Sequence, residues 1–175
     1  MRAGWVLLLG LFSLGMAQEK NTLSHLEEVV GLIAQAQRQI VLVAPGLYNP
    51  AIASALHKAA VERGVQVLLL LEIDSINQPS SYAAAFGFLA PEKPLYVRAV
   101  RAVRLSPRLL LDSRVLVSGP LVVGDSLTPE PTRLSTRFTD LAVEIDRFNR
   151  IWQQAPSCRP TAYMLGEELV LRCRF

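Results

Sequence analysis

Apolar residues recur along the first half of the chain with two different spacings, which predict alternating helices and strands. Over residues 22–39 they lie three or four positions apart, which predicts an amphipathic helix. Residues 40–44 are a continuous apolar run, and residues 65–71 are apolar except at Gln66; neither run has the polar alternation of a half-exposed strand, as is typical of strands buried on both faces. Between these runs, Asn49-Pro50 and Gly64 carry the signals that begin and end a helix. The order strand, helix, strand predicts a βαβ unit.

The next part of the chain alternates less regularly and predicts longer loops. Prolines and polar residues over 74–94 predict a loop with one short helix at 82–89. Strands are expected at 95–103 and 109–117. The polar residues Asp112-Ser113-Arg114 stand inside the second of these runs and predict a tight turn. The sequence therefore predicts a β-hairpin around Asp112.

The last part of the chain predicts one long helix. Residues 121–123 predict a short strand and 124–133 a loop, before an amphipathic helix at 139–154 that Pro156 ends. The helix is expected to have a solvated charged face and an apolar face that packs on the core. The charged residues are Glu144, Asp146, Arg147 and Arg150, and the apolar ones are Ile145, Phe148 and Trp152.

The composition indicates a globular domain and excludes several other classes of protein. The chain has 175 residues, of which 51% are apolar, and a formal net charge of +3. These values suffice for one domain with a hydrophobic core, and they exclude disorder over most of the chain. Two cysteines are too few for a cysteine-based zinc cluster, and no metalloprotease, hydrolase or phosphate-loop motif is present. No metal and no cofactor are therefore expected.

Residues 1–17 have the three parts of a secretory signal peptide. One positive charge precedes an apolar run, and the small residues Gly15 and Ala17 precede a cleavage site before Gln18. The alternative is a membrane anchor, but a run of about 12 apolar residues is shorter than the ~20 that a spanning helix needs. The sequence predicts a secreted or periplasmic protein without a transmembrane anchor after cleavage.

An oxidising compartment changes the interpretation of the two cysteines. Cys158 and Cys173 flank two short apolar runs that predict a hairpin over residues 156–175. A disulfide between them would close this hairpin. The alternative is a pair of free redox-active thiols, but the cysteines lack the close C-x-x-C spacing that tunes the pKa of such thiols.

Two blocks of the sequence resemble the phospholipase D superfamily. The first, IVLVAPGLYNPAIASALHKAAVERGVQVLLLLE, is similar to the opening βαβ unit of that family. The second, RLSPRLLLDSRVLVSGPLVV, is similar to its signature strand-turn-strand, H-x-K-x-x-x-x-D followed by G-R and G-S-x-N. The resemblance covers about residues 22–155. It implies an α/β phospholipase D-like sandwich over residues 18–155, with a mixed β-sheet and flanking helices.

The resemblance also implies a phosphodiesterase chemistry that can be checked residue by residue. In the family one histidine attacks phosphorus and a second protonates the leaving alcohol, so a chain with a single motif copy would need a homodimer. The positions that match the histidine, lysine, aspartate, serine and asparagine of the motif are Leu105, Pro107, Asp112, Pro120 and Val122. A register shifted by one residue places Ser106 and Arg108 at the histidine and lysine positions. Neither register contains an imidazole that could act as nucleophile or acid.

The two histidines of the chain lie elsewhere. His25 and His57 both stand on predicted helices, where each is expected to be an ordinary helix residue. His57 is adjacent to Lys58, and neighbouring helical side chains diverge by about 100°. A different phosphodiesterase site that uses His57 remains the alternative.

Several arginines stand close together around the motif. The candidates for binding phosphate are Arg101, Arg104, Arg108 and Arg114. Guanidinium groups bind phosphate bidentately, so these residues suit a phospholipid head group or a nucleic acid. The alternative is a solvated strand edge whose charges discourage aggregation. With only Tyr96 nearby, stacking on single-stranded nucleic acid is not supported.

Two functional hypotheses follow. The first is an exported phospholipase D-like protein without catalytic activity, which acts in the cell envelope as a binding or structural module for a phosphate-bearing ligand or a protein partner. The second is a residual phosphodiesterase, of phospholipase or nuclease type, with a rewired site that uses Ser106, Arg108 or His57.

Overall fold

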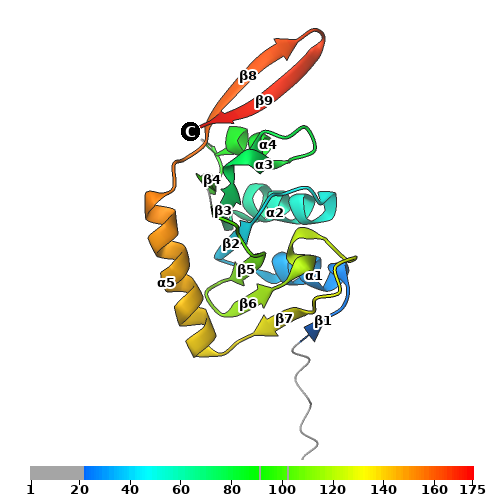
Figure 1. Cartoon of the computed structure of the whole chain (residues 1–175), viewed down its shortest axis with the longest axis vertical. Coiled ribbons are helices and arrows are strands. Elements are labelled where there is room, and N and C mark those ends of the chain that lie inside the picture. The colour runs from blue at the N-terminus through cyan, green and yellow to red at the C-terminus, as the bar shows by residue number, and fades with distance from the viewer. Residues whose placement is uncertain (1–21, 91, 102) are drawn as a thin grey trace, which may run out of the picture.

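The computed structural model describes residues 22–90, 92–101 and 103–175, which form a seven-stranded mixed sheet with helices on both faces and a separate two-stranded sheet (Figure 1). The strand order of the large sheet is β1-β7-β6-β5-β2-β3-β4. Its strands are β1 (Thr22–Leu23), β2 (Gln39–Ala44), β3 (Gln66–Glu72), β4 (Leu95–Val100), β5 (Arg108–Leu111), β6 (Val115–Ser118) and β7 (Thr132–Ser135). The helices are α1 (Leu26–Gln35), α2 (Pro50–Arg63), α3 (Ile73–Ile76), α4 (Ala83–Leu89), the 3₁₀ helix η1 (Pro120–Val123) and α5 (Phe138–Gln154). The small sheet consists of β8 (Arg159–Leu165) and β9 (Glu168–Arg174).

The predicted βαβ unit is confirmed. Strands β2 and β3 pair in parallel with Ile40 opposite Val67, and β4 continues the parallel part on the other side of β3. Helix α2 connects them, and the side chain of Asn49 caps it by accepting hydrogen bonds from the backbone N–H groups of Ala51 and Ile52. The helix ends at Gly64, whose φ of 69° is the left-handed conformation that glycine adopts without a steric cost.

Alternate residues of β2 serve two different cores. Ile40, Leu42 and Ala44 pack with α1 and α2 on one face of the sheet. Val41 and Val43 pack against α5 on the other face, in a second cluster that includes Leu141 and Phe148. A strand with both faces covered needs a continuous apolar run, which is the pattern that the sequence has here.

The predicted hairpin around Asp112 is also confirmed, and its turn has an unusual backbone. Strands β5 and β6 pair antiparallel, and the backbone N–H of Arg114 donates to the carbonyl of Leu111 to close the turn. Asp112 and Ser113 both have positive φ, 52° and 56°. Aspartate tolerates this region better than most residues, and two consecutive positive φ values match the right-handed twist of a tight hairpin.

Two predicted strand boundaries are wrong. Residues 121–123 form the 3₁₀ helix η1 instead of a strand, because Gly119 has φ 135° and Pro120, which starts the helix, has no N–H with which to continue a ladder. Strand β4 ends at Val100, three residues earlier than predicted. Arg101 and Arg104 therefore lie in the connection between β4 and β5.

The other predicted elements were close to those of the structure, with differences at three places. Helix α1 begins at Leu26, because the carboxylate of Glu28 accepts the backbone N–H groups of Ser24 and His25 and holds both outside the helix. The loop predicted at 74–94 also contains the short helix α3. The end of the loop predicted at 124–133 pairs with β6 and β1 as strand β7.

The C-terminal residues form the predicted hairpin. Strands β8 and β9 pair antiparallel along their whole length, and Cys158 and Cys173 form a disulfide with an S–S distance of 1.99 Å. The disulfide rests on Gly87 of α4, where a Cβ atom would lie 2.5 Å from the Sγ of Cys158. The disulfide therefore joins the two strands at the base of the hairpin, where the base packs on α4, and the two cysteines are not free thiols.

No helix in the described part of the chain is both long and apolar enough to cross a membrane. The predicted signal peptide, residues 1–17, lies outside the described residues.

Candidate functional site

One edge of the sheet is formed by the carboxyl ends of β2 and β3, the first residue of β5 and the last residue of β6. Strand register places Val43 of β2 opposite Arg108 of β5, and Arg108 opposite Ser118 of β6. The motif-equivalent positions Leu105 and Pro107 immediately precede this point, and Pro120 follows it. The structure therefore brings these positions together at the edge where α/β sheets usually bind ligands; we call it the motif edge.

The side chains at these positions are mostly part of the two hydrophobic cores. Leu105 is 5% exposed and packs in the cluster beneath α5, while its backbone N–H donates to the carboxylate of Glu72 over 2.8 Å. Val122 is 1% exposed and packs in the opposite cluster. Pro120 is also buried. Three positions that would carry polar groups in the motif are filled by apolar packing residues.

The shifted register places different groups at this edge. Ser106 is exposed, and its hydroxyl has no hydrogen-bond partner among the described residues. The guanidinium of Arg108 pairs with the carboxylate of Glu144 on α5, with a distance of 3.4 Å between Nε and Oε2. Glu144 is 7% exposed, so the prediction of a solvated glutamate here is wrong. Its burial is possible because the charge is paired.

Asp112, which matches the aspartate of the motif, lies at the opposite end of β5 and has a structural task. Its carboxylate accepts the backbone N–H groups of three consecutive residues, Gln37, Arg38 and Gln39, over 2.8–2.9 Å. Burial alone raises the pKa of this carboxyl group, but the three hydrogen bonds and the nearby charge of Arg114 outweigh burial, so that the pKa lies below its ordinary value. Asp112 thereby ties the hairpin turn to the connection between α1 and β2.

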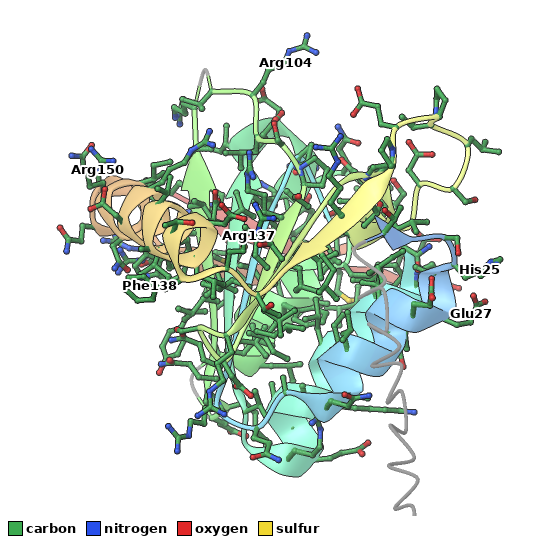
Figure 2. All side chains as sticks on the ribbon, turned by 90° about the horizontal axis from the view of Figure 1, so that it is seen from below. His25, Glu27, Arg104, Arg137, Phe138 and Arg150 are labelled. Carbon is green, nitrogen blue, oxygen red and sulfur yellow. A yellow bond between two sulfur atoms is a disulfide. The ribbon has the colours of Figure 1, made fainter. Side chains whose placement is uncertain are left out.

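The four arginines proposed from the sequence do not form one cluster. Arg114 stands in the hairpin turn beside Asp112, at the other end of β5 from Arg108. Arg101 lines a separate hollow near the C-terminal half of α5. Arg104 is exposed and projects into solvent from the connection between β4 and β5 (Figure 2). Only Arg108 lies in the hollows described next.

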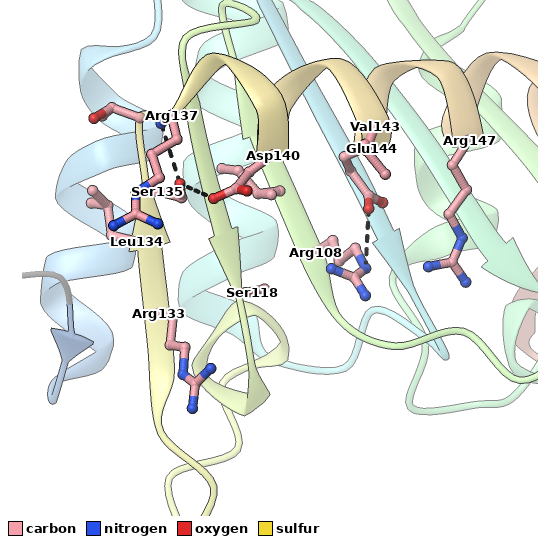
Figure 3. Close-up of a pocket in the computed structure, with 12 residues that line it drawn as sticks. Arg108, Ser118, Arg133, Leu134, Ser135, Arg137, Asp140, Val143, Glu144 and Arg147 are labelled. Carbon is pink, nitrogen blue, oxygen red and sulfur yellow. Dashed lines mark hydrogen bonds and ion pairs between the residues drawn. The ribbon is translucent and has the colours of Figure 1, made fainter.

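Two hollows meet at Arg108, Ser118 and Arg133. The larger, of about 600 Å³, lies between strands β6 and β7 and helix α5, and we call it the arginine groove (Figure 3). The smaller, of about 470 Å³, lies along the motif edge and is called the edge hollow. The charged residues of the arginine groove are Arg108, Arg133, Arg137, Asp140, Glu144 and Arg147. Those of the edge hollow are Arg108, Asp125, Glu130 and Arg133.

The balance of charge distinguishes the two hollows. In the edge hollow two arginines face two carboxylates, and the pKa of Asp125 lies below its ordinary value because Thr128 and the backbone N–H groups of Leu127 and Thr128 bond its carboxylate. In the arginine groove four arginines face two carboxylates. Both of these carboxylates have partners, Glu144 with Arg108 and Asp140 with the hydroxyl of Ser135 at 2.6 Å. The arginine groove is therefore the more favourable place for an anion.

Three cations of the arginine groove remain without an acidic partner. Arg133, Arg137 and Arg147 form no ion pair with any described residue. Sequence reasoning missed them, because Arg133 stood in a predicted loop and Arg147 in a helix face interpreted as solvated. The sequence offers one indication of them, namely that arginines stand just before the final helix and within it. Their position beside Arg108 depends on the antiparallel pairing of β7 with β6, which the sequence alone does not indicate.

Neither histidine lies in these hollows. His57 is exposed on α2, and His25 caps the N-terminus of α1 (Figure 2). Neither side chain lines the arginine groove or the edge hollow. In the described part of the chain, no group of three or more histidine, cysteine, aspartate or glutamate residues could hold a metal ion.

Comparison with solved structures identifies the fold. Nuc from Salmonella typhimurium, a phospholipase D family member, superposes with a TM-score of 0.60 and 18% identity, over 76% of this chain and 90% of Nuc. NucT from Helicobacter pylori superposes with a TM-score of 0.62 and 12% identity, over 75% and 89% of the two chains. The chain has a phospholipase D-like fold. The fold class expected from the sequence is thus confirmed.

A third solved structure resembles this phospholipase D-like chain over part of its own length. TrmBL2, an archaeal chromatin protein described as showing a novel mode of DNA binding, superposes with a TM-score of 0.56 and 22% identity. The superposition covers 77% of this chain and 51% of TrmBL2. No protein-family model and no curated protein matches the sequence.

Proposed function

We propose that this phospholipase D-like protein is a non-catalytic module that binds a phosphate-bearing ligand in the arginine groove. The observation that carries the proposal is the contrast between the motif positions and the groove. Leu105, Pro120 and Val122 are buried packing residues, whereas Arg133, Arg137 and Arg147 are cations without acidic partners among the described residues.

The chemistry of the family mechanism supports the proposal that this protein does not cleave phosphodiesters. A phosphohistidine intermediate needs an imidazole as nucleophile, and departure of the alcohol needs a group that titrates near neutral pH. At the motif-equivalent positions along this edge, the described residues are a leucine, a serine and prolines instead, and the carboxylates of the edge hollow, Asp125 and Glu130, are not imidazoles. Arg108 could bind a phosphate but cannot act as an acid or base, because guanidinium stays protonated.

A nucleic-acid backbone is the ligand that the groove supports best. Its lining combines arginines with Ser118, Ser135 and Thr136 and contains no aromatic residue. Such a surface suits contacts to phosphates rather than stacking of bases, so we expect binding to duplex DNA without sequence preference. The resemblance to TrmBL2, described as a DNA-binding chromatin protein, is consistent with this ligand.

The proposed place of action is outside the cytoplasm. The Cys158–Cys173 disulfide is compatible with an oxidising compartment, and the predicted signal peptide supports export. We therefore propose a role in the cell envelope or the surrounding medium, where a phospholipid head group is the competing phosphate-bearing ligand.

A residual phosphodiesterase is the second candidate, and the exposed Ser106 is the observation that favours it. Its hydroxyl lines the edge hollow next to Arg108, which could hold a phosphate. A serine needs an adjacent base to become a nucleophile, however, and no described residue forms a hydrogen bond with this hydroxyl.

The binding proposal can be tested with the purified protein and two probes in parallel. Fluorescence anisotropy would follow a labelled 20-base-pair duplex, and sedimentation would follow vesicles that contain an anionic phospholipid, both over a range of salt concentrations. With three unpaired arginines we expect the slope of log affinity for DNA against log salt to be about −3.

The variant Arg133→Ala/Arg147→Ala should weaken DNA binding by at least tenfold and reduce the slope to about −1. Arg114 is exposed, as Arg133 and Arg147 are, but it lies outside the groove. Arg114→Ala is therefore the matched control and should bind DNA like the parent. Equal losses in both variants would contradict a site in the groove. Binding to vesicles alone would contradict the nucleic-acid ligand.

A further inference from the structure

The C-terminal hairpin presents an uncovered strand edge. The disulfide joins the two strands at its base, which packs on α4, and its distal half projects beyond the body of the protein (Figure 1). Large apolar side chains are exposed on this distal half: Met164 by 61%, Leu165 by 66% and Leu169 by 64%. An exposed strand with apolar side chains is a template for pairing with another strand.

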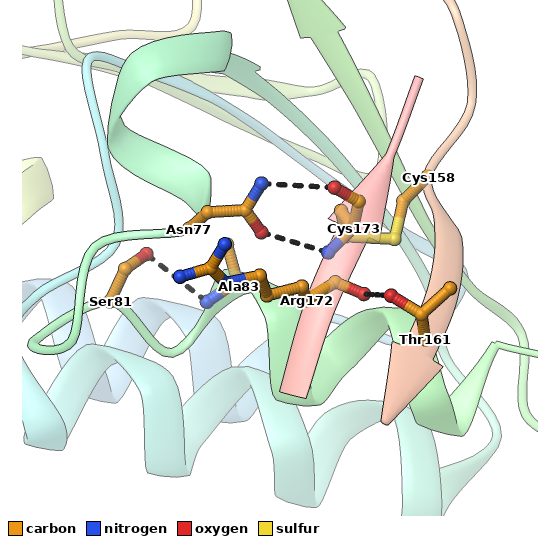
Figure 4. Close-up of a disulfide and its surroundings, with 7 residues drawn as sticks. All are labelled: Asn77, Ser81, Ala83, Cys158, Thr161, Arg172 and Cys173. Atoms are coloured by element: carbon orange, nitrogen blue, oxygen red, sulfur yellow. Dashed lines mark hydrogen bonds between the residues drawn. A yellow bond between two sulfur atoms is a disulfide. The ribbon is translucent and has the colours of Figure 1, made fainter. Parts of the chain in front are cut away.

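The hydrogen bonds of Cys173 establish which edge of β9 is open. Its backbone N–H donates to Oδ1 of Asn77 over 2.8 Å, and its carbonyl accepts from Nδ2 of Asn77 over 2.9 Å (Figure 4). Both backbone groups of Cys173 therefore point away from β8. Because this direction alternates along an antiparallel strand, the backbone groups of Leu171 and Leu169 point the same way.

The side-chain amide of Asn77 thus takes the place of a neighbouring strand by bonding the outward backbone groups of Cys173, but it does so only at the base of the hairpin. No described residue bonds the outward backbone groups of Leu169 and Leu171. The outer edge of β8 differs, because Pro160 has no N–H and stands on that edge. The open pairing edge of the hairpin is therefore the segment 169–171 of β9.

The sequence of β9 is complementary to itself when it is read in the opposite direction. It begins with Glu168, continues with Leu169, Val170 and Leu171, and then reaches Arg172. An antiparallel copy centred on Val170 places Glu168 opposite the partner's Arg172, and the reverse pair forms by symmetry. Opposite charges directly across a pair of strands stabilise it, and like charges destabilise it.

We propose that β9 pairs antiparallel with β9 of a second copy of this chain, about a twofold axis at Val170. In this register Leu169 exchanges backbone hydrogen bonds with the partner's Leu171, and all open groups of the edge are used. The two hairpins form one four-stranded sheet, and the apolar side chains of Leu169 and Leu171 cover those of the partner. This interface is independent of the function proposed for the arginine groove.

The neighbouring registers are less favourable. A pairing centred on Leu171 places Leu169 opposite the partner's Cys173, whose backbone groups are already bonded to Asn77. A pairing centred on Leu169 places Glu168 opposite the partner's Val170, so that both ion pairs are lost. The charges and the open backbone groups therefore select the same register.

A second copy fits this edge better than a lipid surface does. The tip of the hairpin carries two adjacent carboxylates, Glu167 and Glu168, of which Glu168 lies opposite Leu165. Inserting the tip into a membrane would bury both charges without partners, which is costly. In the paired sheet one of them meets an arginine.

The first test uses the residue on the axis. In the variant Val170→Cys the two introduced cysteines face each other in a non-hydrogen-bonded pair, where Cα atoms are about 4.5 Å apart, which suits a disulfide. We expect most of the purified protein to run as a reducible dimer on a non-reducing gel. Leu169→Cys is the control, because its copies lie diagonally at about 7–8 Å and should cross-link far less.

The second test exchanges the charges. Glu168→Arg and Arg172→Glu should each raise the dissociation constant of the dimer by about tenfold or more, and the double variant Glu168→Arg/Arg172→Glu should restore it. Analytical ultracentrifugation of the full chain over a range of concentrations measures this constant. Peptide mapping that finds the Cys158–Cys173 bond in each variant shows that the hairpin has kept its base.

The outcomes separate clearly. Preferential cross-linking of Val170→Cys together with restoration by the double variant supports the proposed pairing. A parent protein that stays monomeric at all concentrations would overturn it, as would equal cross-linking of Val170→Cys and Leu169→Cys. A dimer that is unaffected by either charge reversal would place the interface elsewhere on the molecule and also overturn it.

Discussion

The two ends of the β5–β6 hairpin have opposite characters. At the turn, Asp112 matches the aspartate of the phospholipase D motif in the predicted register, and three backbone N–H groups donate to its carboxylate. At the motif edge, Leu105 and Pro120 are buried instead of the histidine and serine that the motif would have. The two ends are separated by only the four residues of β5.

In the register predicted from the sequence, residues matched to one motif therefore serve unrelated structural tasks. The aspartate has a structural role, because its carboxylate accepts backbone N–H groups and holds the turn against the connection between α1 and β2. The positions matched to the histidine, serine and asparagine of the motif are occupied by the buried residues Leu105, Pro120 and Val122. A match at Asp112 is therefore an indicator of the fold, and it carries little information about activity.

The largest effect is expected from removing the carboxylate at the turn. Asp112→Ala loses three hydrogen bonds to a charged acceptor and places alanine at a φ of 52°, so the free energy of unfolding should fall by about 3 kcal/mol. Asp112→Asn keeps one acceptor oxygen and tolerates the backbone, so it should lose about half as much. Urea denaturation measures both values.

The control for this variant is Asp146→Ala. The carboxylate of Asp146 pairs only with Arg150, one turn along the exposed face of α5. Its removal should change the free energy of unfolding by less than about 0.5 kcal/mol. Similar effects of Asp112→Ala and Asp146→Ala would contradict the structural role of Asp112.

A smaller loss of stability is expected when the motif is restored at the other end. The variant Leu105→His/Pro107→Lys places polar groups in and next to the core beneath α5, and should lower the free energy of unfolding by about 2 kcal/mol. It should be inactive toward bis(p-nitrophenyl) phosphate, as we propose for the parent, because Pro120 and Val122 still occupy the positions matched to the serine and asparagine. Turnover by this variant would show that only two residues separate the chain from an active site.

The acid sensitivity of the protein should depend on the turn as well. The pKa of Asp112 is lower in the folded protein than in the unfolded chain, so its stabilising effect is complete above about pH 4, the unfolded value. This contribution is lost as the pH falls through the folded pKa. Asp112→Asn should therefore show a shallower decline of the urea midpoint between about pH 4 and pH 2 than the parent. Parallel declines would contradict the account.

The smallest effect concerns the arginine groove. Glu144→Gln removes the negative charge that Arg108 faces, which changes the net charge of the lining from +2 to +3. The affinity for duplex DNA should rise about threefold, with a slightly steeper dependence on salt. Asp146→Ala, on the exposed face of the same helix, is the control. A loss of affinity in Glu144→Gln would mean that the glutamate positions Arg108 for the ligand.

The sequence predicts the central fold well because the central strands are buried on both faces. Apolar runs at Ile40–Ala44 and Val65–Leu71, the second interrupted only by Gln66, with a capped helix between them, permit few arrangements other than a βαβ unit. The Asp112 turn and the disulfided hairpin were also predictable from local residues. The 3₁₀ helix at Pro120 was not, because Leu121-Val122-Val123 reads as a strand unless the conformation of Gly119 is known.

The candidate site was much less predictable than the fold. The arginines near the motif in sequence were the obvious candidates, but Arg114 and Arg108 stand at opposite ends of one strand. The arginine groove combines Arg108 with Arg133 and Arg147, which come from β7 and α5. Its assembly depends on long-range strand pairing and helix packing, and no local pattern indicates it. The buried Glu144 was misread for the same reason, since its partner lies on another element.

The claim that the protein binds phosphodiesters without cleaving them is tested most directly by one gel experiment. A labelled DNA duplex is incubated with an excess of the protein, and portions are run on native and denaturing gels. The account predicts a retarded band on the native gel and full-length strands on the denaturing gel, unchanged in Ser106→Ala and His57→Ala. Shortened strands that disappear in either variant would contradict it, because the nucleophile would then be present in this chain.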